Sequence, residues 1–245
     1  MASCDLMIAG GTVLVSASPP VVLEHAAVAV VGAAVADVGP EPEVASRWTT
    51  RSVIDATEAV ISPGFVDAHV HLAAPGGYGQ RGYTRGVTAG PFAGGGKGEG
   101  MTPLVGGMVN RPAHHDAVRA VAAVRLAAML RCGYTGVVDA GGPGAQAVAE
   151  AAEWIGIRAA VGPSLADVWH DETGRFGRRM DIESILTRAA VELDWLAEHD
   201  VSTLQPIISA AGTQTSSDEL LSGVAALAAD RGLGVHVPVT YALRP

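Results

Sequence analysis

The sequence predicts an α/β protein in which a small all-β unit, residues 1–60, precedes a series of β–α units, residues 61–245. Residues 5–60 contain short apolar runs separated by turns, with no helical period of useful length. From residue 61 onward, five apolar strand-like runs alternate with four helical segments. Repeated β–α units with uninterrupted apolar strands indicate a parallel sheet, either a barrel or a doubly wound layer.

The elements of the first unit are expected to be hairpins. The run "DLMIAGGTVLV", residues 5–15, is apolar on both sides of a Gly-Gly pair, which is a hairpin signal. The run "AAVAVVGAAVADVG", residues 26–39, repeats this pattern. We therefore expect short paired strands in this unit.

The elements of the second unit are bounded by helix-capping signals. Gly133 is expected to end the helix of residues 114–133, and Asp181 is placed to cap the helix of residues 181–200. Ser216 and Glu219 are expected to form a capping box for the helix of residues 216–232. The expected strands are residues 60–70, 134–142, 157–165, 202–210 and 233–239, and the expected helices are residues 114–133, 144–156, 181–200 and 216–232. A long glycine-dense loop, residues 73–111, separates the first strand from the first helix.

The length of the second unit limits how much of a barrel it can form. A complete TIM-type (β/α)8 barrel needs about 250 residues, and residues 61–245 supply fewer. The barrel interpretation therefore implies an incomplete TIM-type barrel of about five of eight strands, whose open edges favour homo-oligomers. A complete doubly wound domain would explain the length instead.

Composition narrows the classes of partner. Net charge is −9, aromatic residues are 4% of the chain and no basic run occurs, so we expect no nucleic-acid partner. No apolar run reaches transmembrane length, so we expect no membrane partner either. Cys4 and Cys132 are the only cysteines and form no disulfide framework, which favours a cytoplasmic location.

The run "PGFVDAHVHL", residues 63–72, places His69 and His71 at the end of the first strand of the β–α series. Side chains two apart on a strand face the same side. Two imidazoles on one side suit a divalent metal, which binds histidine nitrogen at about 2.0–2.1 Å. Barrel enzymes build their sites at this carboxyl end of the strands. The alternative is a strand end carrying two solvated histidines.

This stretch, "AVISPGFVDAHVHL", resembles the signature of the metal-dependent amidohydrolase superfamily. The run "MLRCGYTGVVDAGGPGAQAVAEAAEWIGIRAAVGPSL" is similar to the second and third βα units of its cytosine deaminase-like and triazine hydrolase-like branch. "TSSDELLSGVAALAADRGLGVHV" resembles the fourth helix and fifth strand of that branch. The resemblance implies a small N-terminal β-sandwich at residues 1–60 and a partial metal-dependent hydrolase barrel at residues 61–245.

The resemblance also implies a ligand set. Both histidines of the His-x-His pair, His69 and His71, would bind the metal. On the fifth strand, where the branch carries its next histidine ligand, Pro238 cannot serve and His236 is the remaining candidate. Ala211 stands where a histidine is expected at the end of the fourth strand, and the aspartate of an eighth strand would lie beyond Pro245. His170, after the third strand, is a candidate substrate-binding residue, and no catalytic proton-transfer residue is identified.

The leading hypothesis is therefore a hydrolase with a divalent metal ion, zinc or else iron. A zinc-bound water with a pKa near about 7 would attack a small nitrogen-rich molecule and break a C–N bond by deamination or amide hydrolysis. The alternative is a truncated or degenerate amidohydrolase relative without catalytic activity. We expect little turnover from this chain alone, since nothing before Pro245 clearly supplies proton transfer.

Overall fold

A computed structural model describes residues 1–73, 115–141, 144–170, 176–178, 181–199, 201–213 and 215–239, with the backbone alone for 169–170 and 176–178. The chain divides into two units, Met1–Gly64 and Phe65–Pro245. The glycine-dense stretch expected to be a loop lies, after Ala73, outside the described residues. Within the described part, no helix combines the length and apolar character that crossing a membrane would require.

The first unit is built on a five-stranded sheet in which β2, β3 and β4 form an antiparallel meander, while β6 and β7 pair in parallel with β2. A separate parallel pair joins β1 to β5. The elements are β1 (Ala2–Ser3), β2 (Leu6–Ala17), β3 (Pro20–Val31), β4 (Ala34–Pro40), α1 (Glu41–Arg47), β5 (Trp48–Thr49), β6 (Val53–Asp55) and β7 (Val60–Ile61). The β-sandwich expected of this unit stays a prediction.

The Gly-Gly pair of β2 does not make the hairpin turn that its flanking apolar runs predict. Strand β2 continues through Gly10 and Gly11 with an irregularity in its register there. Gly10 has a φ of +84°, and a Cβ on it would lie 2.8 Å from the Thr57 hydroxyl oxygen. The glycines therefore serve a bulge. The second hairpin signal is confirmed, since β3 and β4 join at Gly32 with a φ of +58°.

The short helix α1 was not expected from the sequence. It has Pro42 in its first turn, Glu41 and Glu43 at its positive end and Arg47 in its last turn, which are the charge preferences of a helix. Seven residues are too few to show an apolar period, so these end signals were the only ones available.

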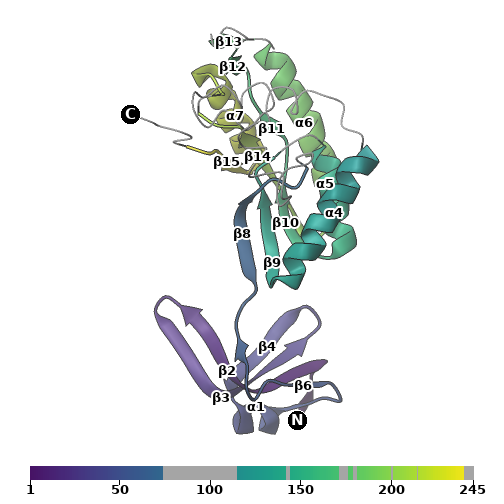
Figure 1. Ribbon diagram of the computed structural model, residues 1–245, viewed down its shortest axis with the longest axis vertical. Coiled ribbons are helices and arrows are strands. Elements are labelled where there is room, and N and C mark those ends of the chain that lie inside the picture. The colour runs from purple at the N-terminus through teal and green to yellow at the C-terminus, as the bar shows by residue number, and fades with distance from the viewer. Residues whose placement is uncertain are drawn as a thin grey trace, which may run out of the picture. The chain divides into compact units, whose positions relative to one another are not determined.

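The second unit is built on a six-stranded parallel sheet, in which five strands follow the order β8–β9–β10–β14–β15 and a short sixth strand, Ser164–Leu165, also pairs with β14 (Figure 1). Its helices connect consecutive strands. The strands are β8 (Phe65–Val70), β9 (Tyr134–Asp139), β10 (Arg158–Val161), β14 (Leu204–Ala210) and β15 (Gly234–His236), and the helices are α4 (His115–Arg131), α5 (Ala145–Ile155), α6 (Ile182–Glu198) and α7 (Asp218–Arg231). The five strands and four helices of the prediction are thus confirmed.

The strand order excludes the doubly wound alternative. Neighbouring strands follow one another along the chain without a reversal, and right-handed crossovers in one direction place every helix on the same face. A doubly wound sheet needs a reversal, which brings helices to both faces. The sheet is a parallel half-barrel, in agreement with the predicted incomplete TIM-type barrel.

Two details depart from the expected boundaries. The first expected strand, residues 60–70, is two strands, since β7 pairs with β2 and β8 pairs with β9. The third is also interrupted: after β10 the chain resumes as β11 (Ser164–Leu165), which pairs with β14. A small antiparallel pair, β12 (Val168–His170) and β13 (Phe176–Arg178), follows.

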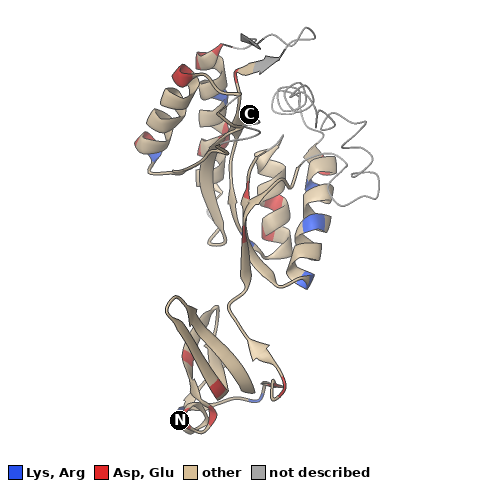
Figure 2. Ribbon diagram, turned by 60° about the vertical axis from the view of Figure 1, so that its left-hand side comes forward, with Lys and Arg blue, Asp and Glu red and all other residues tan. Residues whose placement is uncertain are grey.

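Two buried clusters hold the helices to the sheet. One contains Leu126 of α4, Val148 of α5 and Val137 of β9, and the other contains Leu193 of α6, Leu220 of α7 and Ile208 of β14. Figure 2 shows that the charged residues of this unit lie mainly on its helices, while the strands carry few. This division is what a sheet covered by helices requires.

The helix caps are partly as predicted. The Asp181 carboxylate accepts a hydrogen bond from the Ser184 N–H, so the expected cap of α6 is confirmed. The cap of α7 is Ser217, whose hydroxyl oxygen accepts from the Leu220 N–H, and the predicted Ser216 is wrong by one residue. The Ser217 hydroxyl also donates to the buried Asp167 carboxylate at 2.6 Å, a partner 50 residues away that helix-end rules do not consider.

Candidate metal centre

His69 and His71 lie together at the carboxyl end of β8. His69 is on the strand and His71 is the first residue after it. Their rings are edge to face, with centroids 5.1 Å apart and planes at 89°. The two imidazoles therefore lie next to each other, as their spacing on a strand predicts. The pairing of β8 with β9 has a register irregularity between Asp67 and Val70.

His236 reaches the same place from the other edge of the sheet. Its Nε2 lies 2.8 Å from the His69 Nδ1, and the two ring centroids are 5.0 Å apart. In a flat sheet, β8 and β15 would lie four strand spacings apart, or about 19 Å at about 4.8 Å each. Two imidazoles cannot bridge that separation from opposite edges. The contact therefore depends on the curvature of the half-barrel.

His71 is oriented by a backbone carbonyl. Its Nδ1 lies 2.9 Å from the Gly141 oxygen, just beyond the end of β9. A carbonyl oxygen can only accept, so Nδ1 carries the proton and Nε2 has the lone pair that a metal would use. Second-sphere contacts of this kind accompany almost all metal-binding histidines.

The surroundings favour neutral imidazoles. Partial burial, together with His71 and His236 nearby, holds the pKa of His69 below its ordinary value. Partial burial and then His71 lower the pKa of His236 in the same way. A histidine must be unprotonated to bind a metal, so these shifts keep the two rings in the required state at neutral pH.

The three rings fit a metal only after a small rearrangement. Two nitrogens on a tetrahedral zinc at about 2.0–2.1 Å lie about 3.3 Å apart, and the 2.8 Å between His69 and His236 is a hydrogen-bond distance. In the described residues, no group of three His, Cys, Asp or Glu side chains is already arranged to hold a metal ion. Zinc would have to displace the shared proton and part these two rings by about half an ångström.

Asp67, which lies on β8 ahead of the two histidines, and the other residues named from the sequence have different surroundings. The Asp67 carboxylate accepts from the His69 backbone N–H at 3.1 Å, and its contact is thus with the backbone. His170 ends β12, but its side chain lies outside the described part of the structure, so its substrate-binding role stays a prediction. The Pro238 carbonyl accepts from the Thr213 N–H and the Ala211 N–H donates to the Leu165 carbonyl, which are structural contacts.

Three further residues beside the site were not recognised as positioning groups from the sequence. Arg125 and Asp139 bind the backbone immediately after β8, and Gly141 supplies the carbonyl that faces His71. Burial raises the pKa of Asp139 to about 6, although hydrogen bonds from the Leu72 and Gly141 backbone and the nearby His71 and Arg125 act to lower it. No short motif marks these contacts, because each joins two different β–α elements.

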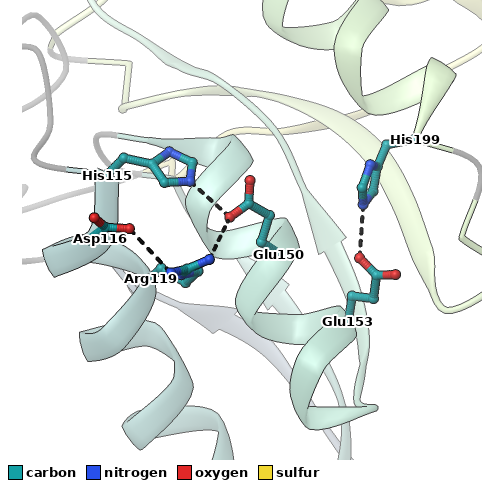
Figure 3. A network of polar contacts seen from close by, with 6 residues as sticks. All are labelled: His115, Asp116, Arg119, Glu150, Glu153 and His199. Atoms are coloured by element: carbon teal, nitrogen blue, oxygen red, sulfur yellow. Dashed lines mark hydrogen bonds and ion pairs between the residues drawn. The ribbon is translucent and has the colours of Figure 1, made fainter.

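Two histidines lie away from this site and are held by glutamates on α5. His115 Nε2 is 2.8 Å from the Glu150 carboxylate, and His199 Nε2 is 2.9 Å from that of Glu153 (Figure 3). All four side chains of these two contacts are partly or largely exposed on the helices. They provide matched controls for the histidines at the strand ends.

Comparison with known proteins places this geometry in context. Residues 60–240 match the model of a family described as the amidohydrolase family. A segment of 73 residues is 40% identical to 5-methylthioadenosine/S-adenosylhomocysteine deaminase 1 of Syntrophus aciditrophicus (strain SB), covering 30% of this chain and 16% of that one. A segment of 87 residues is 38% identical to allantoinase of Salmonella choleraesuis (strain SC-B67), covering 36% and 17%.

Solved structures are similar over almost the whole chain. An adenosine deaminase from Xanthomonas campestris with bound zinc aligns with a TM-score of 0.71 at 23% identity, over 96% of this chain and 49% of that one. Atrazine chlorohydrolase TrzN from Arthrobacter aurescens TC1, complexed with zinc, aligns with a TM-score of 0.68 at 20% identity, over 95% and 52%. This chain therefore spans about half the length of these two structures.

Proposed function

Because the chain belongs to the amidohydrolase family, we propose that it acts as a metal-dependent hydrolase of carbon–nitrogen bonds other than peptide bonds. The observation that supports this is the approach of His236 Nε2 to within 2.8 Å of His69 Nδ1, beside the ring of His71. Three imidazoles from opposite edges of a half-barrel meet at the carboxyl ends of its strands, where barrel enzymes build their sites.

His69, His71 and His236 are the proposed metal ligands, and zinc is the proposed ion. Three protein ligands are what a catalytic zinc site uses, leaving one position for water. When bound, zinc would supply a water acidic enough to serve as a nucleophile near neutral pH. His71 would use Nε2, since Gly141 holds its Nδ1 proton. No proton-transfer residue is assigned among the described residues.

The proposed substrates are small nitrogen-rich molecules. The similar proteins are named as deaminases of adenosine or of 5-methylthioadenosine and S-adenosylhomocysteine, as an allantoinase and as an atrazine chlorohydrolase. Two of these names are those of deaminases, and deamination or amide hydrolysis of a nitrogen-rich molecule is the proposed reaction. His170 is the proposed substrate contact. We also propose a cytoplasmic location and a homo-oligomeric state.

Zinc binding tests the proposal most directly. A His69→Ala/His71→Ala double variant and a His115→Ala/His199→Ala control double variant would be loaded with Zn²⁺, dialysed and analysed for metal. We expect the wild type and the control to retain up to one equivalent and the strand-end variant to lose it. Equal retention by both double variants would refute the metal site. A His236→Ala variant with wild-type affinity by calorimetry would remove His236 from the ligand set.

Turnover is tested separately with the zinc-loaded chain. Ammonia release from adenosine, 5-methylthioadenosine and S-adenosylhomocysteine, and hydrolysis of allantoin and atrazine, cover the substrate class. Turnover that requires His69 and His71 would support the hydrolase. Site-specific zinc binding without turnover of any of these compounds would favour the alternative, a non-catalytic relative.

A further inference from the structure

The residues that follow β8 are held by three groups from other elements. The Arg125 guanidinium, on α4, donates through one nitrogen to the carbonyls of His71 and Leu72, at 2.7 and 2.8 Å. The Asp139 carboxylate accepts from the Leu72 N–H at 3.0 Å. The Gly141 carbonyl accepts from the His71 ring at 2.9 Å. His71 and Leu72 are therefore held through their two carbonyls, through the Leu72 N–H and through the His71 ring.

Burial makes these bonds costly to lose. Leu72 is fully buried and Asp139 is 1% exposed, while Arg125 is half-buried. A carbonyl that loses its charged donor in such a place must reach water or remain unpaired, and either outcome displaces the backbone. His71 is the residue whose carbonyl Arg125 holds, so a backbone shift there moves its imidazole directly.

Arg125 and Asp139 both bond the backbone of Leu72, and Asp139 connects that residue to Gly141. Asp139 bonds the backbone of both Leu72 and Gly141, and Gly141 in turn presents its carbonyl to the ring of His71. Gly141 has a φ of +91°, and a Cβ on it would overlap Ser164, so only glycine can present its carbonyl to the ring from this position. The alignment of ring and carbonyl therefore depends on the position of the His71 backbone.

We propose that Arg125 is the positioning residue of His71: by holding the His71 and Leu72 carbonyls, it keeps the imidazole with Nδ1 on Gly141 and Nε2 directed to the metal. The proposal rests on the function proposed above for what His71 binds, but the geometry of the ring is a property of the metal-free protein. Arg125 itself touches neither metal nor substrate in this scheme. Loss of a second-sphere partner typically weakens metal binding by about 10- to 100-fold.

The first measurement is the tautomer of His71 in the metal-free protein, read from ¹⁵N–¹H correlation spectra of the imidazoles and assigned by the His71→Ala variant. We expect the wild-type ring to carry its proton on Nδ1. In Arg125→Met, which keeps an apolar stem without a donor, we expect a mixture of Nδ1–H and Nε2–H forms. Arg119→Met is the matched control, since Arg119 lies on the same helix and forms its ion pairs with Asp116 and Glu150, away from β8 (Figure 3). It should keep the wild-type tautomer.

The second measurement is zinc affinity by calorimetry on the same variants. We expect Arg125→Met to bind about 10-fold more weakly than the wild type and Arg119→Met to bind equally. Arg125→Gln, which is too short to reach both carbonyls, should behave as Arg125→Met and carries the test if the methionine variant does not fold.

The two measurements separate the two proposals. A folded Arg125 variant that keeps the Nδ1–H tautomer and the wild-type zinc affinity overturns the positioning role. Equal changes in the Arg119 control overturn it as well, since the effect would then be a general loss of stability. If the wild type binds no zinc, the proposed function fails while the tautomer measurement still decides the role of Arg125.

Discussion

Asp139 should make the metal-free protein less stable as the pH rises from acid to neutral. Its carboxyl group is 1% exposed, and burial raises its pKa from 3.8 to about 6. Between these values the folded protein binds a proton that the unfolded chain has released. The contribution of Asp139 to the free energy of unfolding is therefore largest below pH 3.8 and is lost as the pH rises through about 6.

The magnitude follows from the size of the pKa shift. A difference of about 2 units corresponds to about 3 kcal/mol. Most of the loss, about 2 kcal/mol, falls between pH 4.5 and pH 7.5. Asp139→Asn removes the titration but keeps an oxygen to accept from the Leu72 N–H. The variant will lose some stability at every pH, because an amide replaces an acceptor that also bonds the Gly141 backbone.

The assay is urea unfolding of the wild type and Asp139→Asn at pH 4.5, 6.0 and 7.5 with EDTA present. The free-energy difference between the two proteins should shrink by about 2 kcal/mol from pH 4.5 to pH 7.5, since all other titrating groups cancel in the subtraction. A difference that stays constant within about 0.5 kcal/mol would show that Asp139 has an ordinary pKa. A difference that grows with pH would mean that the hydrogen bonds outweigh burial and that the sign of the shift is wrong.

Two further predictions concern the packing of the half-barrel. Gly162→Ala would place a Cβ against the Ile207 carbonyl, which only a separation of β10 from β14 can relieve, whereas Gly234→Ala meets Ile207 at 3.9 Å. In urea unfolding, we expect Gly162→Ala to lower the free energy of unfolding by about 3 kcal/mol or more and Gly234→Ala to lower it by less than about 0.5 kcal/mol. Equal urea midpoints for the two variants would contradict the close spacing of β10 and β14. Asp167→Ala removes two hydrogen bonds, of 2.8 and 2.6 Å, to the cap residue Ser217. This variant should lower the free energy of unfolding by about 2–4 kcal/mol, whereas Asp218→Asn, in the exposed first turn of α7, should lower it by less than about 1 kcal/mol. Thermal melts in which Asp218→Asn is the less stable variant would reject the role of Asp167 in holding Ser217.

The sequence determined the order and type of the elements because each is specified by residues that are close together in the chain. Apolar runs and the capping residues between them predicted the strands and helices of the second unit. The two-residue period of side chains along a β-strand predicted that His69 and His71 face the same side. Asp181 was found as a helix cap for the same reason, since its partner is three residues away. The sequence misled where a local signal had a second use, as with Gly10–Gly11, where the flexible backbone serves a bulge within β2.

Only the tertiary structure decided which groups surround these histidines. His236 meets His69 across 167 residues, Gly141 meets His71 across 70, and Arg125 reaches the His71 carbonyl across 54. None of these pairs shares a strand or a helix, so no periodicity relates them. Their distances are set by the curvature of the half-barrel, by the pairing of β9 with β8 and by the packing of α4 against β9. These properties arise from many buried contacts at once, whereas a sequence pattern reports only the face of the element to which each residue belongs.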